Sequence, residues 1–310
     1  AQKGQLAVVD LLLARGLDPN TRERGDESYA MHWAAAGGHL VVVRRLADAG
    51  GDVVGRGDAH ELEVIGWATV WDGCDDVHHR AVADFLIRRG ARHHIFSAIA
   101  LDLVDELRRI AAADPSQLDR RMSRFENRRT PLQFAVRQTR SRMVALLLEL
   151  GADPFAVDDG GQPVASYAIT REIDRPVNEA IRRRMLAELS GTRESSVSRR
   201  KLSLALVACL ALDDVSTAES LVQEDASLLR EAGALHLLAK RGDVSGIKWL
   251  LDHGADPNAR WMHWDADVTP LHLTAFSDRV ESAWLLLAAG ADPRIRDSKY
   301  DSDALGWAEH

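Results

Sequence analysis

One phrase returns four times along this 310-residue chain, and it limits the possible folds more than any other feature. Each copy has consecutive leucines, then a glycine, then Asp-Pro. The copies are "LLLARGLDPN" (11–20), "LLLELGADPF" (146–155), "LLDHGADPNA" (250–259) and "LLLAAGADPR" (285–294). Glycine adopts the left-handed conformation that ends many helices, and proline cannot continue a helix. Each copy therefore predicts the end of an apolar helix and the start of a loop.

A second phrase precedes these glycines at a constant distance. It reads "YAMHWAA" from Tyr29, "TPLQFAV" from Thr130, "TPLHLTA" from Thr269 and, more loosely, "EAGALHLLA" from Glu231. One of its positions lies 18 residues before the closing glycine in four pairs: His32 and Gly50, Gln133 and Gly151, His236 and Gly254, His272 and Gly290. This pattern predicts a repeat made of a short helix, a turn, a longer apolar helix and a loop.

"TPLHLTA" followed at this spacing by "GADP" resembles the ankyrin repeat, whose period is about 33 residues. The resemblance covers nearly the whole chain. It implies an all-α fold, a solenoid of stacked helix-turn-helix units with projecting loops. It also implies a module that binds a protein partner through its concave face and loop tips, although a fold alone does not determine a function.

The repeats group into two expected arrays. The N-terminal array covers 1–190, with about six repeats, of which the first is partial and one carries an insertion. Residues 191–201 are polar and predict a linker, and a C-terminal array over 202–310 ends in a truncated repeat. Two repeats, near 93–121 and 202–230, lack the Gly-Ala-Asp ending and predict a longer loop. Because the chain begins and ends within a repeat, we interpret it as a fragment or as an array with irregular ends.

Charge is distributed unevenly between the arrays. Residues 202–310 hold 18 Asp and Glu against 9 Lys and Arg, whereas residues 1–201 hold 29 against 30. Binding of DNA or RNA depends on basic groups, so we expect no nucleic-acid partner. The acidic C-terminal array instead favours a basic protein partner. The sequence does not specify an oligomeric state.

Cysteine usage and hydropathy bear on the compartment. Cys74 and Cys209 lie far apart and have no CxxC spacing, which indicates neither a disulfide framework nor a zinc site and favours a reducing compartment. No apolar run approaches the roughly 20 residues that span a bilayer, and no signal-peptide pattern opens the chain. We therefore expect no membrane association and a cytoplasmic location.

The histidine of the second phrase is present as His32, His236 and His272. In ankyrin repeats this residue is structural, so the resemblance implies that it bonds to backbone and to the neighbouring Thr hydroxyl and ties successive loops together. A general base or a metal ligand is the alternative. The other repeats carry Gln133, Phe96 and Gly66 at this position. Because a catalytic row would need the histidine kept, we predict the structural role.

The next residue along the phrase is Trp33 in the first full repeat. The equivalent residues in the other repeats are Trp67, Ser97, Phe134, Leu237, Leu273 and Trp307. The resemblance implies that this position faces the concave side. We predict that Trp33, Trp67 and Phe134 form a recognition stripe with a spacing of about 10 Å, one helix diameter. Padding of the neighbouring helix is the alternative.

The repeat near 55–92 is longer than the others, since Gly66 and Gly90 are 24 residues apart instead of 18. The added segment carries Trp71, Asp72, Asp75, Asp76, His78 and His79. Carboxylates and imidazoles are the usual ligands of divalent metals, and acidic groups beside Trp rings suit a cationic ligand. Metal sites normally draw ligands from several elements, whereas these come from one short segment. We therefore predict no metal, with the aspartates capping the next helix.

An enzyme or a small-molecule receptor is the alternative function. It would use a Trp-lined acidic pocket around Trp33, Trp67, Trp71, Asp72 and Asp76. The sequence contains no GxSxG, GxxxxGK[ST], HExxH or dinucleotide-binding pattern. We therefore expect no catalytic residues and no cofactor, and protein binding is the leading prediction.

The segment "ARWMHWDADVTP" (259–270) departs from the short polar loop expected between repeats. Exposed aromatic side chains are costly unless something covers them, and Trp and Met are frequent in binding interfaces. We predict that Trp261, Met262, Trp264 and Asp265 contact a partner or ligand. Coverage by the neighbouring loop "RDSKYDSD" (296–303) is the alternative.

Overall fold

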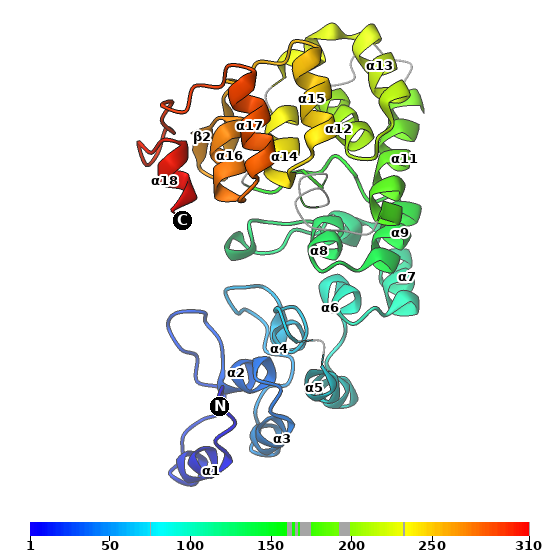
Figure 1. Ribbon diagram of the computed structural model, residues 1–310. Helices are drawn as coiled ribbons and strands as arrows, with labels where there is room; N and C mark the ends of the chain where they lie inside the picture. The colour runs from blue at the N-terminus through cyan, green and yellow to red at the C-terminus, as the bar shows by residue number, and fades with distance from the viewer. Residues whose placement is uncertain are drawn as a thin grey trace. The chain divides into compact units, whose positions relative to one another are not determined.

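The structure is a computed structural model that describes residues 1–74, 76–159, 163, 164, 167, 175–191, 199–231 and 233–309. The chain divides into two compact bodies, Ala1–Ala152 and Asp153–His310, called here the N-terminal and the C-terminal body. Figure 1 colours the chain from its N-terminus to its C-terminus. Each body is described by itself below.

The N-terminal body is built from short and longer helices in alternation. They are α1 (Leu6–Ala14), α2 (Ala30–Ala36), α3 (Leu40–Asp48), α4 (Glu63–Trp67), α5 (Val77–Arg88), α6 (Ile95–Ala100), α7 (Val104–Ala113), the 3-10 turns η1 (Pro115–Asp119) and η2 (Arg124–Glu126), α8 (Pro131–Arg137) and α9 (Ser141–Leu150). The short helices α2, α4, α6 and α8 contact one another in order (Figure 1). The longer helices pair in the same way, α1 with α3, α3 with α5 and α7 with α9. This is the layered stack that the repeats predict.

The C-terminal body repeats the arrangement. Its elements are α11 (Arg175–Gly191), α12 (Arg199–Leu210), α13 (Val215–Glu224), η3 (Ala226–Arg230), α14 (Ala234–Arg241), α15 (Val244–Asp252), β1 (Trp261–His263), β2 (Ala266–Val268), α16 (Pro270–Phe276), α17 (Val280–Ala288) and α18 (Ala304–Ala308). Helices α12, α14, α16 and α18 form the inner row, and α15 packs against α17 behind it (Figure 1). The predicted all-α solenoid is therefore confirmed, with one small β-hairpin added.

Glycine ends helices as the sequence predicts. Gly151 follows α9 with a φ of 101°, and Gly290 lies two residues after α17 with a φ of 97°. Residues with a Cβ atom rarely adopt such angles, whereas glycine does so without a steric penalty. The helix therefore stops there and the chain turns into the next loop.

The two repeats without this glycine end through an aspartate instead. Asp114 follows α7 in an extended conformation and accepts a hydrogen bond from the Ser116 backbone N–H, which starts η1. Asp225 follows α13 and accepts from the Ser227 N–H at the start of η3. The predicted longer ending is thus a capped 3-10 turn.

The division into bodies falls at residue 152, inside the array predicted for 1–190. Helix α11 extends to Gly191 and packs against α12, which begins at Arg199, so both ends of the predicted linker are helical. Residues 192–198, its centre, lie outside the described residues. The division into arrays at 190 and 202 stays a prediction.

Candidate binding surface

The histidines of the repeat join consecutive repeats. His32 is fully buried, its Nε2–H donates to the Gly55 carbonyl at 3.0 Å, and its Nδ1 accepts from the Tyr29 backbone N–H at 3.0 Å. His236 donates in the same way to the Val268 carbonyl at 3.0 Å. Gly55 lies in the loop before α4 and Val268 in strand β2 before α16, so each carbonyl belongs to the segment that precedes the next short helix. These imidazoles are structural, as the sequence analysis predicts.

His272 makes the most complete set of these contacts. Its Nε2–H donates to the Ser302 carbonyl at 3.2 Å, and its Nδ1 accepts from the Thr269 backbone N–H at 3.2 Å and from the Thr269 hydroxyl at 2.8 Å. Burial lowers the pKa of His272, which keeps the ring neutral and fixes this donor and acceptor pattern.

Replacing His272 by alanine is expected to destabilise the C-terminal body by about 1–3 kcal/mol, because a buried hydrogen bond is lost and a small cavity forms. Urea unfolding followed by circular dichroism measures this loss. His253→Ala, at the exposed end of α15, is the control and should leave stability nearly unchanged. A His272→Ala protein as stable as the wild type but unable to bind its partner would contradict the structural role.

One repeat is joined to the preceding repeat by a histidine at a different position, which corrects the alignment made from the sequence. Ser97 stands at the third position of α6, where Phe96 was expected. His94 precedes the helix and donates from Nε2 to the Leu62 carbonyl at 2.9 Å. A Cβ atom on Gly66 would lie 2.8 Å from that Nε2, so only glycine leaves room for the ring.

Trp67 lies at the centre of an aromatic cluster in the N-terminal body. Its ring meets those of His32, Trp33, His60 and Trp71 edge to face, with centroids 5.0–5.7 Å apart. Only 2% of Trp67 is exposed. Its side chain is therefore part of the core.

The indole N–H of Trp67 is satisfied by Asp58, which the sequence analysis did not single out. Asp58 is itself buried and accepts from Trp67 Nε1 at 3.0 Å and from the Glu63 backbone N–H at 2.9 Å. The carboxylate thereby joins the loop before α4 to the helix. Both polar groups can be buried because each forms a hydrogen bond with the other.

The same pair recurs in the C-terminal body. Trp307 is 6% exposed and donates from Nε1 to Asp297 at 2.9 Å, and Asp297 also accepts from loop N–H groups. Burial alone raises the pKa of Asp297, but these hydrogen bonds outweigh it and hold the pKa below its usual value. Tyr167 donates to Asp158 at 2.6 Å with a similar spacing. An acidic residue nine or ten positions before an aromatic residue was the available signal.

The predicted stripe of Trp33, Trp67 and Phe134 is therefore not an accessible surface. Phe134 is 2% exposed and packs edge to face on Phe96, with centroids 5.7 Å apart. Trp33 alone keeps partial exposure, and its ring lies 5.0 Å from that of Trp67. Packing between helices, the alternative weighed for this position, accounts for the two buried rings, because the slot faces the next helix of the stack. A binding role for Trp33 stays a prediction.

The inserted segment caps a helix, as expected. The Asp76 carboxylate accepts from the backbone N–H groups of His78 and His79, both at 2.9 Å, at the start of α5. These bonds, together with the His79 side chain, lower the pKa of Asp76 to about 2. Asp75 lies outside the described residues. In the part of the chain that the structure describes, no three His, Cys, Asp or Glu side chains are arranged to hold a metal ion.

Two residues of the alternative acidic pocket do line a cavity, but it is small, about 160 Å³. Trp71 and Asp72 stand at its wall, whereas Trp33, Trp67 and Asp76 do not. Asp72 forms an ion pair with Arg137, at 3.2 Å. Of the five residues proposed from the sequence, Trp33, Trp67 and Trp71 meet in the aromatic cluster, and Trp71 and Asp72 line this cavity.

The segment predicted to bind a partner forms the β1–β2 hairpin of the C-terminal body. Its strands pair Trp261 with Val268 and His263 with Ala266, so Trp264 and Asp265 make the two-residue turn. Trp264 has a φ of 55°, an angle that large residues rarely adopt and that normally selects glycine or asparagine. The turn therefore displays an indole at a backbone position that does not favour it.

The four predicted residues of the hairpin have different surroundings. Trp261 is partly buried and packs against a cluster that includes Val268 and Trp307. Met262 is 54% exposed and Trp264 is 42% exposed. Asp265 is exposed and forms an ion pair with Lys299 of the neighbouring loop. That loop contacts the hairpin, as the alternative proposed, and yet leaves Met262 and Trp264 accessible.

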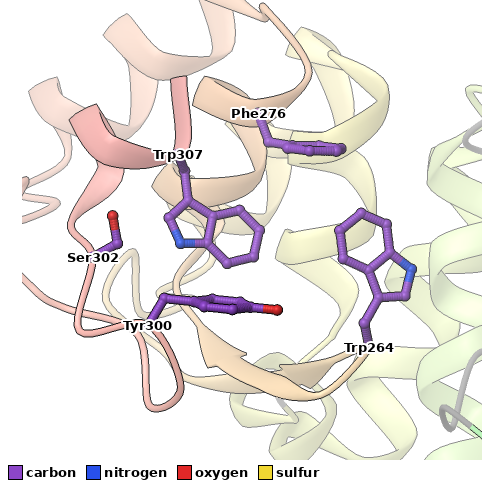
Figure 2. Close-up of a pocket in the computed structure, with 5 residues that line it drawn as sticks. All are labelled: Trp264, Phe276, Tyr300, Ser302 and Trp307. Carbon is purple, nitrogen blue, oxygen red and sulfur yellow. The ribbon is translucent and has the colours of Figure 1, made fainter. Parts of the chain in front are cut away.

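A pocket of about 320 Å³ opens beside this turn. Its lining is Trp264, Phe276, Tyr300, Ser302 and Trp307. Figure 2 shows the four rings arranged around a common space, with Phe276 and Tyr300 on opposite sides of it. Trp264 comes from the hairpin, Phe276 from the end of α16, Tyr300 from the loop before α18, and Trp307 from α18. Of these four residues, Trp264 alone was predicted to bind, because Phe276, Tyr300 and Trp307 lie outside the hairpin segment.

A partly buried lysine supports the turn from behind. The Lys240 ammonium lies 4.4 Å from the centre of the Trp264 ring and donates to His263 Nε2 at 2.9 Å. Burial lowers the pKa of Lys240 to about 8 and that of His263 to about 2, so His263 stays neutral. The Lys240 contact holds the indole of Trp264 in place.

Comparison with known protein families identifies the same repeats. Three family models match: "Ankyrin repeats (many copies)" at residues 1–47, "Ankyrin repeat" at 127–159 and "Ankyrin repeats (3 copies)" at 205–297, together more than half of the chain. No curated protein matches the sequence.

Two solved structures are similar to part of the chain. The ankyrin repeat domain of Bcl-3, a unique member of the IkappaB protein family, is 20% identical, and the match covers 70% of this chain and 94% of that one with a TM-score of 0.36. The human ASB11 ankyrin repeat domain is 21% identical, with 70% and 92% covered and a TM-score of 0.36.

None of the helices in the described ranges has both the length and the apolar character needed to cross a bilayer. Ankyrin repeats serve generally as protein-interaction modules. The stacked helix pairs, the histidines that join successive repeats and the three matching family models lead to one conclusion: the chain belongs to the ankyrin-repeat family.

Proposed function

We propose that this chain is a protein-binding module whose C-terminal body recognises a basic partner through the tip of the β1–β2 hairpin. The observation that carries the proposal is the exposure of large apolar side chains in one place. Met262, Trp264 and Tyr300 are 54%, 42% and 60% exposed. Exposed aromatic groups that gather around a concavity are typical of binding sites.

Charge supports the choice of a basic partner. The segment 202–310 has twice as many acidic as basic residues. A surface of one sign raises the local concentration of oppositely charged partners and accelerates their association. Apolar anchors such as Trp264 then supply most of the binding free energy, because such anchors dominate protein interfaces.

The partner of this surface can be found by affinity enrichment with the whole chain as bait and quantitative mass spectrometry. Changing Trp264 to serine is expected to weaken binding of the enriched partner at least tenfold, about 1.4 kcal/mol. Trp284→Ser is the matched control, since Trp284 is 69% exposed on α17 and does not line the pocket. Equal binding by the Trp264→Ser protein and the wild type would refute the proposed surface.

A further inference from the structure

The aromatic pocket has a chemistry of its own. We propose, building on the proposed function, that Trp264, Phe276, Tyr300 and Trp307 form a site for the guanidinium group of an arginine side chain on the basic partner. The inference deepens the proposal above by naming the group that enters the pocket.

The lining of the pocket is almost entirely aromatic. Four of the five lining residues carry rings, and the fifth is Ser302. Aromatic rings carry partial negative charge on their faces, so they attract cations as well as apolar groups. Ring faces offer a cation an electrostatic attraction that aliphatic side chains do not. The composition of the wall therefore favours a cation.

The chain already places its own cations on two of these rings. The Lys240 ammonium lies 4.4 Å from the centre of Trp264, and the Lys299 ammonium lies 4.8 Å from the centre of Tyr300. Both distances are within the range of a cation–π interaction. These ring faces therefore hold positive groups in this protein.

The polypeptide around the pocket is acidic. The hairpin and residues 296–303 carry five aspartates against one arginine and one lysine, and Lys240 behind the turn adds a third positive charge: Asp265, Asp267, Asp297, Asp301 and Asp303 against Arg296, Lys299 and Lys240. Their net charge attracts a cation to the mouth of the pocket. This charge complementarity selects a positive ligand over a neutral one.

The polarity of the wall selects guanidinium over ammonium. Only the hydroxyl groups of Ser302 and Tyr300 are available among the lining side chains, so an ammonium ion would lose its water without sufficient replacement. A guanidinium group is more weakly hydrated and stacks flat on aromatic rings while its N–H groups stay at the edge. Figure 2 shows the rings of Phe276 and Tyr300 on two sides of the space, an arrangement that suits a flat group between them.

The test compares two probes of the same shape and different charge. Nα-acetyl-arginine methylamide and its neutral citrulline analogue are titrated into the full chain, and the indole N–H signals of Trp264 and Trp307 are followed by NMR. We expect arginine to bind at least about tenfold more tightly than citrulline. The lysine analogue should bind more weakly than arginine. Equal affinities for arginine and citrulline, equal affinities for arginine and lysine, or no saturable shift with arginine would each overturn the proposal.

A variant at Phe276 tests whether the aromatic ring itself is needed, or only an apolar side chain of similar size. Phe276→Leu keeps an apolar wall and removes one π face, so it should reduce arginine affinity severalfold and change citrulline affinity little. Trp284→Leu, outside the pocket, is the control and should change neither. An unchanged arginine affinity in a folded Phe276→Leu protein contradicts the proposal. If that variant does not fold, the comparison of arginine with citrulline on the wild-type protein still tests the proposal.

The outcomes distinguish this inference from the proposed function. If Trp264→Ser weakens partner binding while arginine and citrulline bind alike, the hairpin surface stands and arginine recognition is wrong. If Trp264→Ser leaves partner binding intact, the proposed surface itself is wrong, whichever probe the pocket prefers.

Discussion

Replacing Trp67 by alanine is expected to destabilise the N-terminal body by about 3–5 kcal/mol, the usual cost of emptying a large buried aromatic site. The indole contributes contacts to four rings and the hydrogen bond to Asp58. Alanine removes all of them and leaves the Asp58 carboxylate without one of its donors. Urea unfolding followed by far-ultraviolet circular dichroism measures the change.

Two variants bracket this result. Trp67→Phe keeps a ring and loses only the indole N–H, so its loss should be smaller, about 1–2 kcal/mol. Trp284→Ala, on a 69% exposed side chain of α17, should stay within about 0.5 kcal/mol of the wild type. A Trp67→Ala protein that unfolds at the wild-type urea concentration but loses partner binding would restore the recognition stripe and refute the core assignment.

Lowering the pH from 6.5 to 4 is expected to reduce the stability of the C-terminal body by about 3 kcal/mol through His236 alone. Burial lowers the pKa of His236 in the folded chain to about 4, from an ordinary value of 6.5. The unfolded chain therefore takes up a proton first as the pH falls. The stability is complete above pH 6.5 and is lost progressively toward pH 4.

His263 acts in the same direction, because burial and the nearby Lys240 charge lower its pKa to about 2. Urea unfolding at a series of pH values measures the slope. His236→Gln is the control, since Gln133 occupies the same position in α8 and caps its helix with Thr130. The variant should lose a large part of the slope between pH 6.5 and 4. A wild type whose stability is constant over this range would show that the imidazole titrates normally.

Much of the fold is determined by local sequence. The 18-residue spacing predicts the helix pairs, and glycine at the helix ends predicts where they stop, because both depend on backbone geometry within one repeat. The structural role of His32, His236 and His272 is also predicted by the sequence, because these residues recur at one position of the repeat. Asp76 caps α5 for the same kind of reason, since a capping carboxylate reaches only the first turn of its own helix.

The site depends on contacts that the repeat pattern does not encode. The sequence marked the hairpin through its unusual Trp264, and it offered the loop that contains Tyr300 as an alternative cover, but it gave no indication that Phe276 and Trp307 would line a pocket there. Trp67 is buried and Trp264 is exposed, although both are tryptophans in unusual segments of the sequence. Neither the lining of the pocket nor the burial of each tryptophan can be read from composition or periodicity.

The sequence by itself determined the repeat, the helix pairs, the capping residues and the acidic charge of the C-terminal part. The tertiary structure alone decided which tryptophans are buried against Asp58 and Asp297 and which rings line the pocket. The physical reason is range: caps and helix ends involve residues a few positions apart, whereas exposure depends on which loop packs over a side chain. The loop before α18 folds back over the hairpin from more than thirty residues away, as the bond of 2.7 Å between Ser298 Oγ and the Asp267 N–H illustrates.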